Sequence, residues 1–164
     1  MQRRTFLLSL AAVLGSRWAA ASPETAVTPL KKPKSDWKKI LPPERYAILF
    51  DEDTERAGSS PLNHEKRKGT FVCAACGLPL FDSSRKFESG TGWPSFFDPI
   101  PGHVATSRDF KLILPRTEYH CARCGGHQGH VFDDGPAPTG LRYCNNGLAL
   151  EFVPKGQPLP ELRS

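Results

Sequence analysis

Four of the five cysteines occur in two short and similar motifs. Cys73-Ala-Ala-Cys76-Gly and Cys121-Ala-Arg-Cys124-Gly each follow a strand-like run, and in both a glycine follows the second cysteine. A tight turn with this spacing directs both sulfurs to one side, and glycine allows the backbone amides to curl toward them. Together the motifs supply four thiolates, which is the ligand set of a closed structural zinc site.

The same four cysteines have two other interpretations. An exported protein can form two disulfides, although five cysteines would leave one thiol over. A redox-active Cys-x-x-Cys usually opens a helix, where the helix dipole lowers the pKa of the thiol. Here the motifs continue as Gly-Leu-Pro-Leu and Gly-Gly-His-Gln, which are poor helix starts. We therefore prefer the zinc interpretation over the disulfide and redox alternatives.

The fifth cysteine, Cys144, stands apart from both motifs. In a strand, Arg142 and Cys144 point to the same face, and a guanidinium beside the sulfur favours the reactive thiolate. Leu141 and Tyr143 would then face the core. The following Asn146-Gly147 is a hairpin turn signal between two strand-like runs. Cys144 is thus a candidate nucleophile, and an inert buried cysteine is the alternative.

Two histidines and two aspartates lie within eight residues, a short distance before Cys144. His127 and His130 are three apart, and Asp133 and Asp134 follow. Because four thiolates already complete a zinc shell, metal binding by these histidines is disfavoured. Imidazoles beside a carboxylate and near a reactive thiol favour acid catalysis, and a structural role is the alternative.

A third cluster joins glycine-rich backbone to aromatic side chains. It runs from Ser89 to Phe97 and reads Ser-Gly-Thr-Gly-Trp-Pro-Ser-Phe-Phe. Such a segment can form one wall of a pocket, and packing in the core is the alternative.

Short strands are expected to position these residues. Sixteen prolines and 14 glycines among 164 residues argue against long helices. From Thr70 onward, short apolar runs alternate with clusters of Gly, Pro and Asp, which is typical of antiparallel sheets. The predicted strands are Thr70–Cys73, Leu78–Phe81, Asp109–Leu114, Glu118–Cys121, Leu141–Cys144 and Leu148–Val153. A short helix is predicted over Pro43–Phe50 and a surface loop over Asp51–Lys68.

The first 21 residues have the features of an export signal. Arg3 and Arg4 precede the apolar run Phe6–Leu14, and Ala19-Ala20-Ala21 supplies the small residues that a signal peptidase accepts. The apolar run is too short to span a bilayer as a stable helix. Arg-Arg-Thr-Phe-Leu looks like a twin-arginine signal, and an ordinary export signal is the alternative. Cleavage would remove three arginines and no acid, lowering the formal charge from +5 to +2, so nucleic-acid binding loses its main support.

The rest of the chain divides into three predicted parts. Residues 22–40, rich in Pro, Lys, Ser and Thr, read as a linker or arm that is partly disordered. Residues 41–154 hold all the motifs and form one domain. Residues 155–164 read as a flexible tail.

In their order along the chain, these motifs resemble one known family. The two Cys-x-x-Cys pairs, Ser-Gly-x-Gly-Trp-Pro-Ser-Phe, His-x-Gly-His-Val-Phe-x-Asp-Gly-Pro and Pro-Thr-Gly-x-Arg-Tyr-Cys-x-Asn look like those of the B-type methionine sulfoxide reductases. These enzymes reduce the R epimer of methionine sulfoxide to methionine. The resemblance covers about Leu41 to Pro154. It implies a mainly β fold of the β-tent type, with two antiparallel sheets, short N-terminal helices and a structural zinc site.

The resemblance also implies roles for individual residues. Cys144 would be the nucleophile that attacks the sulfoxide sulfur and is left as a sulfenic acid. His130 and His127 would be active-site histidines, with His130 the better candidate for contact with the substrate oxygen. Asp134 and Arg142 would orient this network. The remaining implied site residues are Asn146 as a further polar group, Trp93 and Phe96 as substrate-binding aromatics, and Cys73, Cys76, Cys121 and Cys124 as ligands of one Zn²⁺.

Three positions depart from the pattern of that family. Thr91 stands where many members have a resolving cysteine, so no free thiol would remain to attack the sulfenic acid. This predicts a one-cysteine cycle in which an external thiol, either a thioredoxin-like protein or a small thiol, regenerates Cys144 directly. Gln128 and the run Asn145-Asn146-Gly147 also differ, and they could alter substrate preference.

Two other functional classes explain part of the sequence. A zinc-ribbon binding module without catalysis would use the four cysteines and leave Cys144, His127 and His130 idle. A thiol–disulfide oxidoreductase would need its Cys-x-x-Cys pairs free of metal. We expect instead a monomeric periplasmic enzyme that acts on oxidised methionine in proteins or peptides. We expect no nucleic-acid partner and no stable membrane association after signal cleavage.

Overall fold

The computed structural model describes residues 27–110 and 115–164. The predicted signal peptide lies outside these residues, as do residues 111–114 of one predicted strand. Two short helices come first, α1 (Lys34–Ile40) and α2 (Pro43–Asp51), and a proline precedes each. Among the described residues, none of the helices has the length and apolar character needed to cross a membrane.

Helix α1 corrects the prediction of a partly disordered linker or arm over residues 22–40, for the part from residue 27 onward that the structure describes. Trp37, at the middle of α1, is only 1% exposed, and its ring stacks on Phe50 of α2 with centroids 5.5 Å apart. The lysine- and proline-rich composition suggested disorder, but one large aromatic side chain buries enough apolar surface to hold the segment on the domain.

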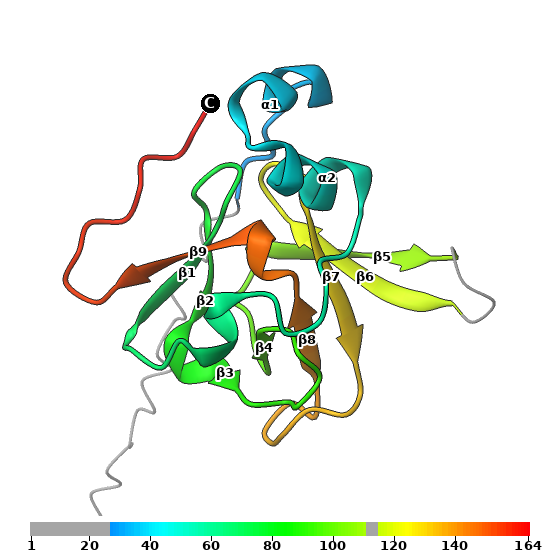
Figure 1. Ribbon diagram of the computed structural model, residues 1–164, viewed down its shortest axis with the longest axis vertical. Helices are drawn as coiled ribbons and strands as arrows, with labels where there is room; N and C mark the ends of the chain where they lie inside the picture. Colours follow the sequence, from blue (N-terminus) through cyan, green and yellow to red (C-terminus); the bar gives the residue numbers. More distant parts are fainter. Residues whose placement is uncertain (1–26, 111–114) are drawn as a thin grey trace, which may run out of the picture.

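Two antiparallel sheets make up the rest of the domain, as predicted. The first has the order β2-β1-β9, formed by Pro79–Asp82, Gly69–Cys73 and Leu150–Pro154. The second has the order β3-β4-β8-β7-β6-β5, formed by Lys86–Phe87, Ser95–Phe96, Arg142–Asn145, His127–Phe132, Arg116–Cys121 and Val104–Asp109. Two short 3₁₀ helices, η2 (Ser83–Arg85) and η3 (Gly147–Ala149), lie where the chain passes between the sheets, and a third, η1 (Pro61–His64), lies between α2 and β1. Figure 1 shows α1 and α2 at one end of the two sheets.

The predicted hairpin at Asn146-Gly147 is wrong. Strands β8 and β9 do not pair, because β8 belongs to the six-stranded sheet and β9 to the three-stranded one. The Asn146 side chain accepts a hydrogen bond from the Glu55 backbone and donates one to the Gln128 carbonyl, and Gly147 begins η3. These tertiary hydrogen bonds override the local turn preference, so the chain crosses from one sheet to the other here.

Other strand boundaries also differ from the prediction. The strand expected over Asp109–Leu114 lies earlier, as β5, and ends at Asp109. Strand β7, over His127–Phe132, was not predicted, because its glycine and histidines carry little strand preference. Both strands prove central to the candidate site.

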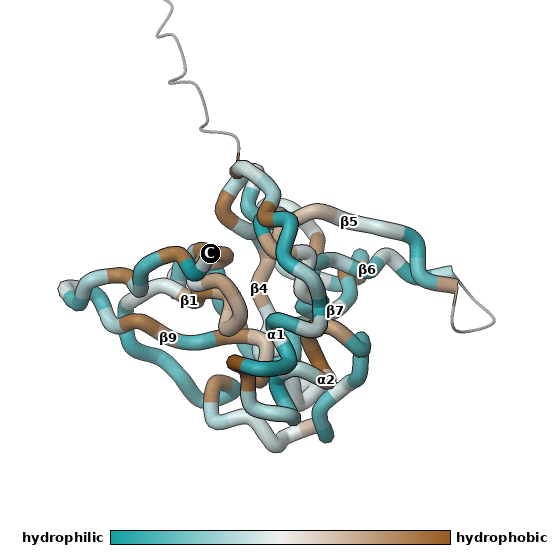
Figure 2. The backbone as a smooth tube through the Cα atoms, turned by 90° about the horizontal axis from the view of Figure 1, so that it is seen from above, coloured by the Kyte–Doolittle hydropathy of each residue, from teal (hydrophilic) through white to brown (hydrophobic). Residues whose placement is uncertain are grey.

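Aromatic side chains from both sheets form the core between them. Phe81 stacks on Phe96 with ring centroids 4.1 Å apart, and Phe71 meets Phe96 edge to face at 4.9 Å. Tyr119 approaches Phe81 from the six-stranded sheet. Burial of each ring contributes roughly 1.5–3 kcal/mol to folding. Figure 2 shows β1 and β9 on one side of β4, and β5, β6 and β7 on the other.

The predicted tail over residues 155–164 makes specific contacts with the domain at its end. The Arg163 guanidinium donates to the carbonyls of Ala74 and Ala75, at 2.9 and 3.0 Å. The Arg163 backbone N–H donates to the Cys76 carbonyl at 3.1 Å. Arg123, in the second cysteine motif, donates to the Arg163 carbonyl at 2.6 Å. The last residues therefore join the two cysteine motifs.

Candidate active site and metal centre

The four cysteines of the two motifs come together in one cluster. Their Sγ atoms lie within 4.8 Å of one another, and Cys73–Cys124 and Cys76–Cys121 are each 3.6 Å apart. A disulfide has its sulfurs about 2.05 Å apart, so the disulfide alternative is contradicted. Four sulfurs at about 2.3 Å from a central metal ion are about 3.8 Å from one another. The cluster therefore fits a tetrahedral structural metal site.

The two cysteine motifs have the same backbone geometry. In the first, the Cys73 N–H donates to the Leu78 carbonyl, and the Gly77 N–H donates to the Cys73 carbonyl, both at 2.8 Å. The second motif repeats these bonds at 2.9 Å, from Cys121 to Gly126 and from Gly125 to Cys121. Gly77 and Gly125 have φ of 79° and 72°, a region that disfavours residues with a Cβ atom. The glycine after each motif thus closes the turn, as predicted.

The register of the six-stranded sheet aligns Cys144 with polar side chains from three other strands. Cys144 in β8 lies opposite His130 in β7, which lies opposite Glu118 in β6, which lies opposite Ser107 in β5. Residues directly opposite one another share a face of the sheet. A second row two residues along this face contains Arg142, Phe132, Arg116 and Asp109.

A cavity of about 240 Å³ opens above these rows. It is lined by Thr54, Trp93, Arg116, Gly129, His130, Phe132, Cys144, Asn145 and Asn146. The Trp93 indole N–H donates to the Glu55 carbonyl at 3.2 Å, which fixes the orientation of the ring. The cavity thus brings a thiol, an imidazole and two aromatic rings together from separate parts of the chain.

Cys144 experiences opposing electrostatic effects. Burial raises the pKa of its thiol, and this effect exceeds the lowering by the positive charge of Arg142 and by a hydrogen bond from Thr91. Arg142 is held by a bidentate ion pair with Asp134, at 2.7 and 2.9 Å, and its guanidinium lies 4.3 Å from the centroid of the Phe132 ring. The expected effect of Arg142 on the thiolate is thus present, but burial outweighs it.

Each candidate histidine pairs with its own carboxylate. His130 Nε2 lies 2.8 Å from Asp109 Oδ2, and His127 Nδ1 lies 2.7 Å from Glu118 Oε1. Burial lowers the pKa of His130, and the hydrogen bond to Asp109 partly offsets this. The two imidazole centroids are 5.6 Å apart.

A β-bulge brings the two histidines to the same side of the sheet. Tyr119 pairs with Gly129 and His120 with His127, which leaves Gln128 as the extra residue of β7. His127 does not line the Cys144 cavity, but it and His130 both line a smaller cavity beside it. Of the two histidines, His130 is therefore the one that lines the cavity of Cys144.

Phe96 lies outside the cavity, contrary to its predicted role in substrate binding. Its side chain is 0% exposed and packs in the core against Phe81. Ser95 pairs with Cys144 and therefore shares its face, so the next residue, Phe96, must point to the opposite face. Phe132 lines the cavity instead. Its position two residues after His130 was the signal that could have identified it.

Of the two remaining polar candidates, Asn146 lines the cavity and Asp134 lies outside it. Asn146 lines the cavity, but both ends of its side-chain amide are hydrogen bonded to backbone, at 3.1 Å. The side chain of Asp134 is 62% exposed and does not line the cavity. Asp134 holds Arg142 through the ion pair, and its negative charge also contributes to raising the pKa of the Cys144 thiol.

Sequence reasoning missed several residues that build the site. Glu55 lies in the predicted surface loop, yet it is 8% exposed and its carboxylate accepts from the N–H groups of Gly147 and Leu148, at 2.6 and 2.9 Å. Its backbone also holds Trp93 and Asn146. Asp109, Arg116 and Glu118 were missed because only strand register brings them to the histidines.

Gln128 links the metal cluster to the strand that carries Cys144. Its side chain is fully buried, and its Nε2 lies 3.6 Å from Cys73 Sγ. Its Oε1 accepts from Asn145, the residue after Cys144, at 3.4 Å. Gln128 is thus a buried polar bridge between the metal cluster and β8.

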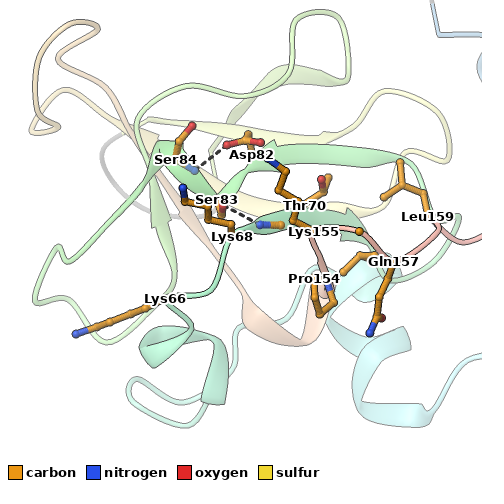
Figure 3. Close-up of a pocket in the computed structure, with 13 residues that line it drawn as sticks. Lys66, Lys68, Thr70, Asp82, Ser83, Ser84, Pro154, Lys155, Gln157 and Leu159 are labelled. Carbon is orange, nitrogen blue, oxygen red and sulfur yellow. Dashed lines mark hydrogen bonds between the residues drawn. The ribbon is translucent and has the colours of Figure 1, made fainter.

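A separate cavity of about 540 Å³ lies on the three-stranded sheet (Figure 3). Its lining includes Lys68, Lys155, Thr70 and Asp82, and the Asp82 carboxylate accepts from the Ser84 N–H at 2.8 Å. Within the described chain, no cysteine or histidine lines this cavity. It therefore offers neither a thiol nucleophile nor an imidazole, and the Cys144 cavity is the candidate active site.

A thiol aligned with an imidazole in a partly closed cavity is typical of an enzyme that uses sulfur as its nucleophile. The SelR domain family matches residues 41–154, and the chain therefore belongs to this family of methionine sulfoxide reductases.

Several relatives in this family are similar over most of this chain. Peptide methionine sulfoxide reductase MsrB of Methanosarcina barkeri is 52% identical over 124 residues, which are 75% of this chain and 87% of the relative. MsrB of Bradyrhizobium diazoefficiens is 51% identical over 125 residues, 76% of this chain and 90% of the relative. The chloroplastic peptide methionine sulfoxide reductase B1 of Arabidopsis thaliana is 51% identical over 120 residues, 73% of this chain and 59% of the relative.

Proposed function

We propose that this protein reduces methionine-R-sulfoxide in oxidised proteins or peptides to methionine. Its family supports methionine sulfoxide reduction in general. The observation that carries the proposal on this chain is the strand register that sets Cys144 opposite His130 at a cavity walled by Trp93. R selectivity would arise because the thiol, the proton donor and the aromatic wall occupy three fixed sides of this cavity.

In the proposed reaction, the Cys144 thiolate attacks the sulfoxide sulfur while His130 transfers a proton to the oxygen. Protonation is needed because the sulfoxide oxygen is otherwise a poor leaving group. The attack forms a transient bond between the two sulfurs. As the protonated oxygen moves from the substrate sulfur to the Cys144 sulfur, the S–O bond of the substrate and this transient bond both break, so methionine leaves and Cys144 is left as a sulfenic acid. One thiolate, one sulfoxide and one proton thus give one methionine and one sulfenic acid. The substrate sulfur gains two electrons and the Cys144 sulfur loses two.

This step needs a thiolate and an imidazolium at the same time. Burial raises the pKa of the Cys144 thiol and lowers that of the His130 imidazole. The reactive pair is therefore a minor protonation state, and its population is nearly constant between the two pKa values. It falls about tenfold for each pKa unit that separates them. Groups that bring the two pKa values closer together would therefore increase the rate.

The substrate sulfur carries an apolar methyl group that needs an apolar surface. Trp93 and Phe132 supply the two aromatic surfaces of the cavity. An indole suits a methyl group next to a polarised sulfur, because the face of the ring is electron-rich. Trp93 is the better candidate for the methyl contact, since its N–H bond to Glu55 holds the ring in place.

Regeneration of Cys144 is proposed to use external thiols. The other four cysteines belong to the metal cluster, and Thr91 occupies the position beside Cys144. A first thiol would displace the hydroxyl of the sulfenic acid as water, forming a mixed disulfide, and a second thiol would release Cys144. A thioredoxin-like protein or a small thiol could serve. Peptide mapping of the oxidised enzyme tests this, because a disulfide between Cys144 and a cluster cysteine would contradict it.

The metal of the cluster is proposed to be Zn²⁺, one per chain. Four buried or half-buried thiolates in a closed shell suit zinc, which would act structurally by holding β1 and β6 together.

The arginine pair and apolar run of residues 1–21 support export through the twin-arginine route. This route carries folded proteins, so zinc could be bound before export. The physiological substrates would then be oxidised exported proteins, and cell fractionation tests this location.

A stereochemical assay tests the proposed reaction. The chain without residues 1–21, and its Cys144→Ser variant, would receive R and S epimers of a methionine sulfoxide peptide with excess dithiothreitol. We expect turnover of the R epimer only, and its loss in Cys144→Ser with the metal content and circular dichroism unchanged. Turnover of the S epimer, or activity retained in Cys144→Ser, would overturn the proposal.

A further inference from the structure

Asp109 is a buried carboxylate that has no assigned role in the proposed reaction. It ends β5, is 8% exposed, and lies in the same row of the sheet as Arg116. Its Oδ2 atom accepts from His130 Nε2 at 2.8 Å and from Arg116 Nη2 at 2.5 Å. One carboxylate oxygen is therefore shared between the imidazole at the cavity and a guanidinium that also lines the cavity.

We propose that Asp109 is the positioning residue for the proton donor of the reaction, and that Arg116 holds Asp109 in place. The proposal rests on the proposed function. Asp109 binds Nε2 of the ring, so Nδ1 is the nitrogen left to transfer a proton to the sulfoxide oxygen. Asp109 does not line the Cys144 cavity and would act only through His130.

The neighbouring pair of Glu118 and His127 shows why Asp109 is the relevant carboxylate. Glu118 accepts from His127 at 2.7 Å and from the Ser107 hydroxyl at 3.2 Å. This pair lies beside the pair of Asp109 and His130, but His127 does not line the Cys144 cavity. Two carboxylate–imidazole pairs thus stand side by side, and only the pair of Asp109 and His130 reaches the nucleophile.

Charged groups from several elements face His130. They are Asp109 from β5, Arg116 and Glu118 from β6, His127 from β7, Cys144 from β8 and, across the smaller cavity, Glu52 after α2. Burial lowers the pKa of His130, and Arg116 and His127 lower it further, whereas Asp109 raises it. Asp109 therefore favours the imidazolium against the low-dielectric surroundings.

The test compares Asp109→Asn with the unchanged protein in a single turnover without reductant. Methionine formation then reports only the steps up to the sulfenic acid. At neutral pH we expect the rate to fall about ten- to a hundredfold, within the range that a positioned acid contributes. The acidic limb of the rate profile should move to lower pH. The peptide concentration for half-maximal rate should stay within about twofold, and Asp109→Glu should recover part of the rate.

A second readout does not depend on turnover. In the Cys144→Ser background, the pKa of His130 can be followed by NMR of its ring nitrogens, with and without Asp109→Asn. We expect a lower pKa in the double variant. Asp51→Asn makes the same change at an exposed carboxylate and should alter neither readout. Glu118→Gln should slow the reaction less than Asp109→Asn.

The outcomes separate this proposal from the proposed function. A rate within about twofold of the unchanged protein, or a slower rate with the pKa of His130 unmoved and no recovery by Asp109→Glu, would overturn the role of Asp109. If the unchanged protein reduced neither epimer, the proposed function would fail. The NMR titration would still decide whether Asp109 sets the protonation of His130.

Discussion

The metal cluster and the Cys144 cavity use the same residue type in opposite ways. Three of the cluster cysteines are at most 1% exposed, and each motif is built by hydrogen bonds within six residues. Cys144 opens onto a cavity, and the residues that line this cavity come from three strands and three connecting segments. A closed metal cluster can therefore be encoded by a few neighbouring residues, whereas the Cys144 cavity depends on strand register.

Loss of the metal is expected to have the largest effect on stability, because it removes the centre of the closed cluster. Cys121→Ser, or a strong chelator, should lower the free energy of unfolding by about 5 kcal/mol or more, because metal binding is coupled to folding. Thermal unfolding and metal content are the measurements. Cys144→Ser is the matched control and should keep both values. Cooperative unfolding of the metal-free protein at the original temperature would show that the cluster is not structural.

The boundary between core and cavity can be tested with two aromatic residues. Phe96→Ala should destabilise the protein by about 3–5 kcal/mol, because a fully buried ring leaves a void. Its KM for the sulfoxide peptide should change little. Trp93→Ala should instead raise KM for the sulfoxide peptide severalfold, with a smaller loss of stability than Phe96→Ala. Denaturant unfolding and steady-state kinetics measure both. A raised KM in Phe96→Ala at unchanged stability would restore its predicted role.

The reactivity of Cys144 should depend on groups that stabilise its thiolate. Thr91→Val removes a hydrogen bond that lowers the pKa of the thiol, so that pKa should rise. A higher pKa means less thiolate at pH 7, and alkylation by iodoacetamide should slow about three- to tenfold. Arg142→Gln should act in the same direction, because it removes a positive charge beside the sulfur. Alkylation rates across pH 6–10 measure the shift, and faster alkylation in either variant would contradict it.

The smallest effect is expected where the end of the chain meets the metal cluster. Arg163→Ala removes two hydrogen bonds to the first cysteine motif and should cost about 1 kcal/mol of stability. Metal release to a chromogenic chelator should become faster, while single-turnover methionine formation stays the same. Lys155→Ala, at the start of the same segment, is the control. Equal rates of metal release from the unchanged protein, Arg163→Ala and Lys155→Ala would mean that the contacts of Arg163 do not retain the metal.

The sequence allowed the locally encoded features to be predicted. The turn of each cysteine motif depends on residues within six positions, so the spacing of Cys73, Cys76 and Gly77 was enough. Alternation along a strand likewise placed Arg142 beside Cys144. The mainly β class followed from the density of proline and glycine and from the spacing of the apolar runs.

The remaining features depend on contacts between distant residues. Nothing near Asp109 in the sequence indicates that it meets His130, because their contact needs the pairing of β5, β6 and β7. The Asn146-Gly147 hairpin failed for the same reason, since Glu55 competes for those residues from 91 positions away. Phe96 was misplaced because a motif in the sequence does not reveal which face of the sheet each residue takes.

The contact of Lys32 with the last residue has a practical consequence for protein engineering. Lys32 Nζ donates to the Ser164 carbonyl at 2.9 Å, although the two residues are 132 positions apart, and Figure 1 shows the end of the chain beside α1. Nearby ends are the requirement for circular permutation. A chain that joins residue 164 to Leu30 through a short glycine linker, with new ends at the exposed Pro101-Gly102 turn, would keep both sheets intact. In that permuted protein, a covalent connection would reinforce the hydrogen bonds that now hold the last residues beside the metal cluster.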